Sequence, residues 1–296
     1  MLNKINMKSI LLLLLAASLY SLIFPINLSS LENGATIFGN TFWQTMIGGT
    51  LLLIISLIKE QKKFTFYSRK SLKCYLIVGA FGFGFPLALF TTIGNNLPVF
   101  LTSIVMALSP TFTYFLSVLL KREKLSYYGF FGIFLGLVGV VILLTPEKII
   151  PNGTVLFWFL IALIVPFFYA IANMSASILI PKETNVIMIG AGYLLGASSI
   201  VLPLMFFSGQ FYLPIKMELF LLATAGGVVN AFFIILFVII IKNYGPTFFS
   251  QFNYLAVIFA IFWASIFFSQ STPLIVFLSL LIMAFGIIVS QLTKKN

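Results

Sequence analysis

The sequence contains no aspartate and no histidine, and six glutamates are its only acidic residues among 296. Because histidine is absent and Cys74 is the only cysteine, neither a Cys/His metal site nor an intramolecular disulfide can form. No serine or cysteine has an evident base to activate it, which argues against an intramembrane enzyme. We therefore expect no catalytic residue, no metal and no cofactor.

Charge of either sign is scarce: 8% of the residues are charged and 61% are hydrophobic, whereas about 25% are charged in soluble domains. A helix needs about 20 apolar residues to cross a bilayer, and such stretches follow one another along the chain. We read the first as an uncleaved helix, because it is too long for a signal peptide. The predicted fold is an all-α integral membrane protein of ten transmembrane helices, at residues 7–26, 36–58, 72–93, 97–120, 126–145, 155–179, 186–207, 217–241, 247–268 and 274–292.

The net charge of +11 is explained by membrane topology. If the N-terminus lies in the cytoplasm, 15 of the 17 basic residues fall on the cytoplasmic side, and only Lys148 and Lys216 fall outside. This bias follows the positive-inside rule and favours an even number of helices with both termini inside. The lipid bilayer is thus the expected partner, with no nucleic acid, and the bacterial inner (cytoplasmic) membrane is the predicted location.

Two halves of five helices each, residues 1–149 and 150–296, must enter the membrane from opposite sides, which predicts an inverted-topology repeat. Weak internal similarity agrees with this prediction. Tyr20 matches Tyr169 at an offset of 149 residues, and Asn96-Leu97-Pro98 matches Tyr244-Gly245-Pro246 at an offset of 148.

One stretch of the chain resembles the fourth-helix signature of EamA-type carriers, which belong to the drug/metabolite transporter superfamily. It runs from Leu97-Pro98 through Ala107-Leu108-Ser109-Pro110-Thr111-Phe112 to Lys121-Arg122-Glu123-Lys124-Leu125. Residues 167–173 and 254–260 are similar to the sixth and ninth helices of that family. The resemblance implies a 5+5 inverted repeat, whose central cavity is lined by helices 1, 3, 4, 6, 8 and 9 and serves transport by alternating access. Helices 5 and 10 would support the structure.

Several positions depart from the family pattern. Gln44 stands where the second helix often carries arginine, so recognition of a substrate carboxylate at that position is not expected. Tyr20-Ser21 replaces a frequent Trp-Gly, Val257 replaces a frequent proline, and Gln270 stands where the first half has Glu123.

All six glutamates fall in predicted loops or at helix ends, so the predicted membrane interior holds no ionisable acid. Coupled carriers often place such a group at mid-membrane because its cost requires a function. We therefore expect a facilitator or exchanger without proton coupling through a side chain, and recognition by amides, hydroxyls and rings. The candidate cavity residues are Tyr20, Ser21, Thr91, Ser103, Tyr169, Asn173, Asn230, Gln251, Asn253 and Tyr254.

Each candidate has a structural alternative. Asn173, Asn230 and Asn253 are equally explained as interhelical clasps, and Asn27 is expected to be solvated near an outer helix end. Proline frees a helical carbonyl and permits a bend. The hinge candidates are Pro25, Pro86, Pro110 and Pro166.

Four glycines in the fifth predicted helix, at positions 129, 132, 136 and 139, form a smooth strip for packing. The strip would serve contacts within the chain or a homodimer.

These features favour a secondary transporter, an exporter or exchanger of small neutral or zwitterionic metabolites such as amino acids. One alternative is an uptake carrier for a nucleoside-type metabolite or S-adenosylmethionine. A channel or a non-transporting membrane scaffold is the alternative from another class.

Overall fold

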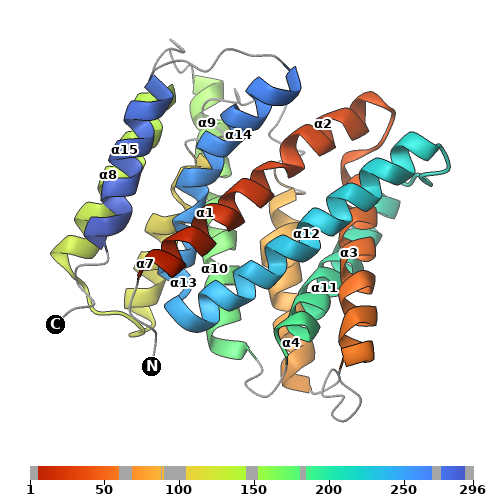
Figure 1. Cartoon of the computed structure of the whole chain (residues 1–296), viewed down its shortest axis with the longest axis horizontal. Helices are drawn as coiled ribbons and strands as arrows, with labels where there is room; N and C mark the ends of the chain where they lie inside the picture. The colour runs from red at the N-terminus through yellow and green to blue at the C-terminus, as the bar shows by residue number, and fades with distance from the viewer. Residues whose placement is uncertain are drawn as a thin grey trace.

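The computed structural model describes residues 6–59, 69–87, 89, 105–144, 153–180, 185–268 and 275–290, and no β-strand occurs within these ranges. The helices are arranged as Figure 1 shows. Their bounds are α1 Met7–Ser21, α2 Ile23–Glu32, α3 Ile37–Lys59, α4 Arg69–Gly79, the π-helix η1 Ala80–Gly84, α7 Ser109–Leu119, α8 Tyr127–Leu144, α9 Gly153–Ala162, α10 Ile164–Leu179, α11 Val186–Phe207, α12 Met217–Tyr244, α13 Pro246–Ser250, α14 Phe252–Phe268 and α15 Ile275–Ser290.

Six helical stretches are long and apolar enough to cross a membrane. Three shorter apolar helices accompany them within the described residues. This is the organisation of a multi-pass membrane protein. The six stretches are Met7–Glu32, Ile37–Lys59, Leu156–Leu179, Val186–Phe207, Met217–Tyr244 and Pro246–Phe267, and the shorter helices are Val105–Leu119, Tyr127–Gly139 and Leu281–Ser290.

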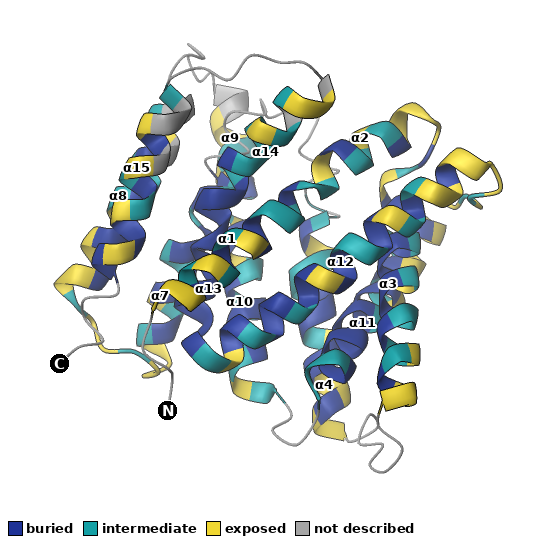
Figure 2. Ribbon diagram, viewed as in Figure 1, coloured by how far each residue is buried: buried dark blue, intermediate teal, exposed yellow. Residues whose placement is uncertain are grey.

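The outer surface of this helical assembly is apolar. Phe207 is 91% exposed and Leu281 is 68% exposed, and many other Phe and Leu side chains point outward in the same way. Figure 2 shows that the buried residues face the neighbouring helices. Acyl chains can cover such a surface, whereas water would not stabilise it.

Helix irregularities lie beside the four candidate hinge prolines. The α1–α2 junction at Leu22 precedes Pro25, and the α9–α10 junction at Leu163 precedes Pro166. Each proline lacks the N–H that would bond to the carbonyl four residues earlier, so the helix is weakened in the preceding turn. Pro110 occupies the first turn of α7, where a missing N–H costs little, and Pro86 follows the π-helix η1.

The first span is longer than the predicted 7–26, because α2 continues to Glu32. Its polar residues have partners inside the protein: Ser30 Oγ donates to the Ile26 carbonyl at 2.8 Å, and Asn27 Oδ1 accepts from two amides of α3. The expectation that Asn27 is simply solvated is therefore wrong. Polar residues near a helix end can be satisfied by a neighbouring helix, which the sequence of one span does not reveal.

Glycines bring two helix pairs into close contact. In α8, a Cβ atom on Gly132 would collide with the backbone of α15 at Gly286 and Ser290, and one on Gly136 would collide with the Tyr254 ring. The α3–α11 pair is closely packed in the same manner at Gly49, where a Cβ atom would overlap Leu195. The glycine strip of α8 therefore serves packing within the chain.

Several of the remaining helix contacts join elements that are far apart in the sequence. Helix α4 packs against α11, and α12 packs against α3. Helix α1 contacts both α12 and α14, while α10 contacts both α4 and α7.

The connection between α11 and α12 is fixed to the start of α3. The Phe38 backbone N–H donates to Gln210 Oε1 at 3.1 Å, and Trp43 Nε1 donates to the Tyr212 carbonyl at 2.9 Å. The Tyr212 hydroxyl is buried without a hydrogen-bond partner. Burial raises the pKa of Tyr212 to about 12, because a phenolate there would lose its solvation.

Candidate functional site

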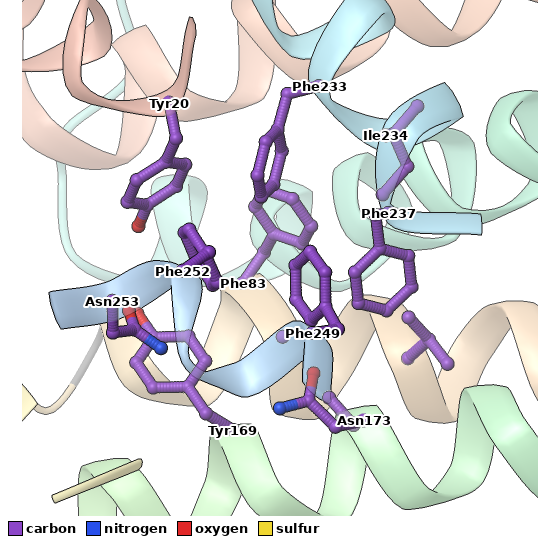
Figure 3. Close-up of a pocket in the computed structure, with 13 residues that line it drawn as sticks. Tyr20, Phe83, Tyr169, Asn173, Phe233, Ile234, Phe237, Phe249, Phe252 and Asn253 are labelled. Carbon is purple, nitrogen blue, oxygen red and sulfur yellow. The ribbon is translucent and has the colours of Figure 1, made fainter. Parts of the chain in front are cut away.

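A cavity opens where α1, α4, η1, α10, α12, α13 and α14 meet, and Figure 3 shows its lining side chains. Seven aromatic side chains and two amides account for most of the lining. The residues are Tyr20, Val78, Gly82, Phe83, Tyr169, Ala172, Asn173, Phe233, Ile234, Phe237, Phe249, Phe252 and Asn253.

One wall of the cavity is a continuous cluster of rings. The Tyr20 and Phe233 ring centroids lie 4.8 Å apart, those of Phe249 and Phe252 lie 4.6 Å apart, and Phe237 meets Phe249 edge to face at 4.7 Å. Each ring is therefore held by its neighbours in a geometry that aromatic pairs favour. The wall is stiff and presents π-surface to the cavity.

Helical spacing explains how these side chains converge. Phe233 and Phe237 are four residues apart on α12, and Tyr169 and Asn173 are four apart on α10, so each pair shares a helix face. Phe249 at the end of α13 lies three and four residues before Phe252 and Asn253 of α14, across the junction at Gln251, and all three line the cavity.

The two cavity amides are both more than nine-tenths buried. Asn173 Nδ2 donates to Thr113 Oγ1 at 3.3 Å, and Thr113 Oγ1 in turn donates to the Ser109 carbonyl at 2.8 Å. Because the Thr113 hydroxyl donates its hydrogen to the Ser109 carbonyl, it can only accept from Asn173. This fixes the orientation of the Asn173 amide.

Asn253 is oriented by the same logic. Its Nδ2 donates to the Ser250 carbonyl at 3.1 Å, and a carbonyl can only accept. No described residue donates a hydrogen bond to either amide oxygen. Figure 3 shows the Asn173 oxygen pointing toward the rings and its nitrogen pointing away from them. The cavity therefore contains two oriented, unfilled acceptors.

Two tyrosines line the cavity, Tyr20 from α1 and Tyr169 from α10. Close by, Gly82 leaves room, since a Cβ atom there would meet only the Ala172 side chain at 3.6 Å.

None of the lining residues carries a charge, and the described glutamates Glu32, Glu123 and Glu218 lie at helix ends or turns away from the cavity. Within the described residues no group of three or more His, Cys, Asp or Glu side chains forms a metal site. The cavity has a volume of about 50 Å³, which is space for a few waters. A larger solute therefore requires the walls to move apart.

The structure brings four of the predicted cavity residues together: Tyr20, Tyr169, Asn173 and Asn253 all line the cavity. Two others, Thr91 and Ser103, lie outside the described residues.

The remaining four predicted residues do not line the cavity, because their polar groups have other partners. Ser21 Oγ donates to the Ser18 carbonyl at 2.9 Å, and the Tyr254 hydroxyl donates to the Ile133 carbonyl at 3.0 Å. Gln251 Nε2 donates to Ser290 Oγ at 3.0 Å, and Asn230 Nδ2 donates to Gln44 Oε1 at 3.4 Å. Asn230 thus forms the interhelical clasp that was one of its two interpretations.

Five phenylalanines of the lining were not predicted from the sequence. With 35 phenylalanines in the chain, their number distinguishes no position. Spacing would have helped: Phe233 and Phe237 repeat at four residues in a cavity helix, and Phe252 directly precedes Asn253. The fifth, Phe83, lies in the π-helix, whose altered register the sequence does not announce.

A second group of amides lies between α2, α3 and α12, and we call Asn27, Asn40, Gln44 and Asn230 the amide cluster. Asn27 Oδ1 accepts from Asn40 Nδ2 at 3.0 Å and from Gln44 Nε2 at 2.9 Å. Gln44 Oε1 accepts from Asn230, as described above. Gly226 makes room for the Gln44 side chain, because a Cβ atom there would overlap it.

Comparison with known proteins relates this chain to a transporter family. The model of the EamA-like transporter family matches residues 7–145, from α1 through α8. Residues 7–145 thus belong to the EamA-like transporter family. This family is part of the drug/metabolite transporter superfamily, so the chain is a transporter-like multi-pass membrane protein.

The fold of this EamA-like protein is shared with solved structures, of which 29 chains match. One of them, "Crystal structure of protein", superposes with a TM-score of 0.80 at 16% sequence identity, over 97% of this chain and 99% of that chain. At this identity the likeness shows the fold alone. No curated protein matches the chain.

Proposed function

We propose that this EamA-like protein is a secondary transporter that moves a small neutral or zwitterionic metabolite, such as an amino acid, by alternating access. The observation that carries the proposal is the cavity. It lies among helices from both halves of the chain, it is lined by rings and two oriented amides, and its lining residues carry no charge. Such a pocket suits a solute that needs no charged partner.

Ten helices in two inverted halves, residues 1–149 and 150–296, with both termini in the cytoplasm, are part of this proposal. The matched helix contacts support it, because α1 with α12 corresponds to α10 with α4, and α12 with α3 corresponds to α4 with α11. Inverted repeats permit one half to rock against the other around a central site. The two candidate hinges Pro25 and Pro166, each just beyond a helix junction on the cavity's α1 and α10 sides, would permit this motion.

An exchanger or facilitator fits the lining better than a proton-coupled carrier. Among the lining residues there is no acid or base to hold a proton at ordinary pH. We propose export or exchange across a bacterial inner membrane, with lipid and the solute as the only required partners.

Uptake of a nucleoside-type metabolite or S-adenosylmethionine is the second candidate, and the ring wall favours it. The stacked pair Phe249 and Phe252, together with Tyr20 and Phe233, would accommodate a flat base. The direction of net flux separates this candidate from the first. A channel would instead conduct without saturation.

Thiol labelling tests whether the cavity opens by alternating access. Cys74, the only cysteine, is replaced by alanine, and Ala172→Cys then places a thiol in the cavity lining. We expect a membrane-impermeant thiol reagent to react with this cysteine, and a transported solute to protect it. Ala170→Cys is the matched control, because Ala170 is fully buried on the same helix and does not line the cavity.

Equal labelling of both cysteines, or labelling of Ala172→Cys that no panel of amino acids and nucleosides alters, would count against a transport cavity at this position.

A further inference from the structure

We propose that the cavity binds an uncharged solute whose flat ring carries an amide group, and that it disfavours both the carboxylate and the ammonium compound of the same ring. This inference rests on the proposed transport function and narrows its substrate class from neutral or zwitterionic solutes to neutral ones. It follows from two properties of the lining. No countercharge is available to it, and each of its polar side chains both donates and accepts hydrogen bonds.

No charged side chain is available to pair with an ionic solute in the cavity. None of the lining residues is charged, and each of them lies in a long stretch of sequence without a charged residue. These stretches are residues 9–31, 74–120, 149–181, 219–241 and 243–293. Widening the cavity between these stretches therefore exposes no charge.

An ion bound in such a lining would lose its solvation without compensation, and this penalty applies to a carboxylate and an ammonium group alike. The ring faces of Tyr20, Phe233 and Phe249 offset only part of it for a cation, because a cation–π contact is much weaker than the solvation that it replaces. An amino acid is a zwitterion and would bear the penalty at both of its charged groups. An uncharged solute avoids it.

The polar groups of the lining are the amides of Asn173 and Asn253 and the hydroxyls of Tyr20 and Tyr169. One N–H of each amide donates to the protein, and among the described residues its second N–H has no acceptor and its oxygen has no donor. A solute amide also contains both a donor and an acceptor, so it can use both kinds of open group. A carboxylate only accepts and an ammonium group only donates, so each would leave part of this lining unpaired.

The aromatic wall favours a flat ring. Phe249 and Phe252 are stacked with their centroids 4.6 Å apart, and the centroids of Tyr20 and Phe233 lie 4.8 Å apart. A planar body gains contact with such rings. Because the cavity has a volume of about 50 Å³, a solute with one ring requires the least separation of the walls. A single ring with an amide is therefore the smallest probe that uses both features.

Four compounds with the same benzene ring test the inference. Benzamide carries the amide, benzoate the carboxylate and benzylamine the ammonium group at neutral pH, while acetophenone keeps the carbonyl and loses the N–H donors. Their affinities for the purified full-length protein in detergent are measured by isothermal titration calorimetry. We expect benzamide to bind about tenfold or more tightly than benzoate and benzylamine, and about fivefold more tightly than acetophenone, which lacks one neutral hydrogen bond.

Asn173→Asp connects this preference to the lining. The change adds a negative charge with almost the same shape, and the Thr113 hydroxyl, which donates to the Ser109 carbonyl, can turn and donate to the new carboxylate. The ratio of benzamide affinity to benzylamine affinity should fall about tenfold or more. Asn243→Asp is the matched control, because Asn243 Nδ2 donates to the Ile239 carbonyl at 2.9 Å and does not line the cavity. It should leave the ratio unchanged.

Asn253→Leu is a second variant, which adds no charge to the lining. It removes both a donor and an acceptor, so it should lower benzamide affinity about tenfold. Acetophenone has only an acceptor, so its affinity should fall by less. Equal losses for the two compounds would contradict amide recognition by this residue.

Benzoate or benzylamine binding as tightly as benzamide would overturn the neutral-solute inference and leave the transport proposal standing. Equal affinities for benzamide and acetophenone would overturn the amide preference, as would an unchanged ratio in folded Asn173→Asp. If none of the four compounds binds while an amino acid or nucleoside shows saturable counterflow in liposomes, the substrate class is wrong and transport is retained. No saturable counterflow of any compound, benzamide included, by monodisperse protein would overturn both.

Discussion

The cavity and the amide cluster contain the same kind of side chain in opposite conditions. In the amide cluster, Asn27 Oδ1 and Gln44 Oε1 accept from neighbouring amides of other helices. In the cavity, Asn173 and Asn253 each donate from the nitrogen to the protein, and no described residue donates to their oxygens. Amides that bond to amides of other helices join those helices, whereas amides that line a cavity can also bind a ligand.

This difference implies that substitutions in the two regions should affect different properties. Removing a cavity amide removes a group that is proposed to bind the solute, so the transport rate should fall more than the stability. Removing a member of the amide cluster leaves its partners unpaired in the folded protein, so stability should suffer more than transport.

The largest effect is expected for the double substitution Asn173→Leu and Asn253→Leu. The two side chains lie on different helices and contact different protein groups, so their effects should combine nearly additively. With about tenfold lost for each, counterflow of the transported solute should fall about 100-fold, while the amount of protein in the membrane stays near that of the wild type. Normal flux in this variant would show that the solute is bound elsewhere.

A smaller effect, of the other kind, is expected for Gln44→Leu. This change deprives both Asn27 and Asn230 of a partner, and an interhelical hydrogen bond in a membrane contributes on the order of 1 kcal/mol. The thermal midpoint of the detergent-solubilised protein should fall by several degrees, as followed by size-exclusion chromatography after heating. Counterflow measured well below that temperature should remain within about threefold of the wild type. A large loss of flux from fully folded protein would place this cluster in the transport path.

Asn230→Leu should be milder than Gln44→Leu. Asn230 gives one hydrogen bond, and at 3.4 Å that bond is long. We expect a loss of about 0.5 kcal/mol in a chemical or thermal unfolding series. If Asn230→Leu proved more destabilising than Gln44→Leu, hydrogen bonding would not be what holds these three helices together.

The smallest effect concerns Tyr212, outside both regions. Its pKa is raised to about 12 in the folded protein, from about 10 in the unfolded chain. Below pH 10 the hydroxyl is protonated in both states, so it adds no pH dependence. Between pH 10 and 12 the unfolded chain loses the proton first, so stability falls as pH rises. Tyr212→Phe should flatten this alkaline fall in thermal midpoint, and an unchanged slope would exclude Tyr212 as its source.

Much of the fold could be predicted from the sequence, because a bilayer leaves few choices. Long apolar stretches must be helices, and the structure places helices at 37–59, 186–207 and 217–244, close to the predicted 36–58, 186–207 and 217–241. The breaks inside spans were harder. The junction at Gln251 has no proline or glycine immediately beside it and depends on packing around α13.

The cavity could be predicted only in part, for a reason that the amides illustrate. Asn173, Asn230 and Asn253 are the same residue in similar apolar surroundings, and each has the same two interpretations from sequence alone. Their difference lies in partners that are distant along the chain, Thr113 for Asn173 and Gln44 for Asn230. Hydrogen bonding across helices is a property of the packed structure, which no single helix encodes.

The most direct test measures counterflow side by side for the wild type, Asn173→Leu and Gln44→Leu, at equal amounts of folded, reconstituted protein. If the cavity is the transport site and the amide cluster a structural clasp, Asn173→Leu loses about tenfold in flux and keeps its thermal midpoint, while Gln44→Leu keeps its flux and loses stability. The reverse pattern, with Asn173→Leu transporting normally and Gln44→Leu inactive though folded, would contradict the assignment of the site.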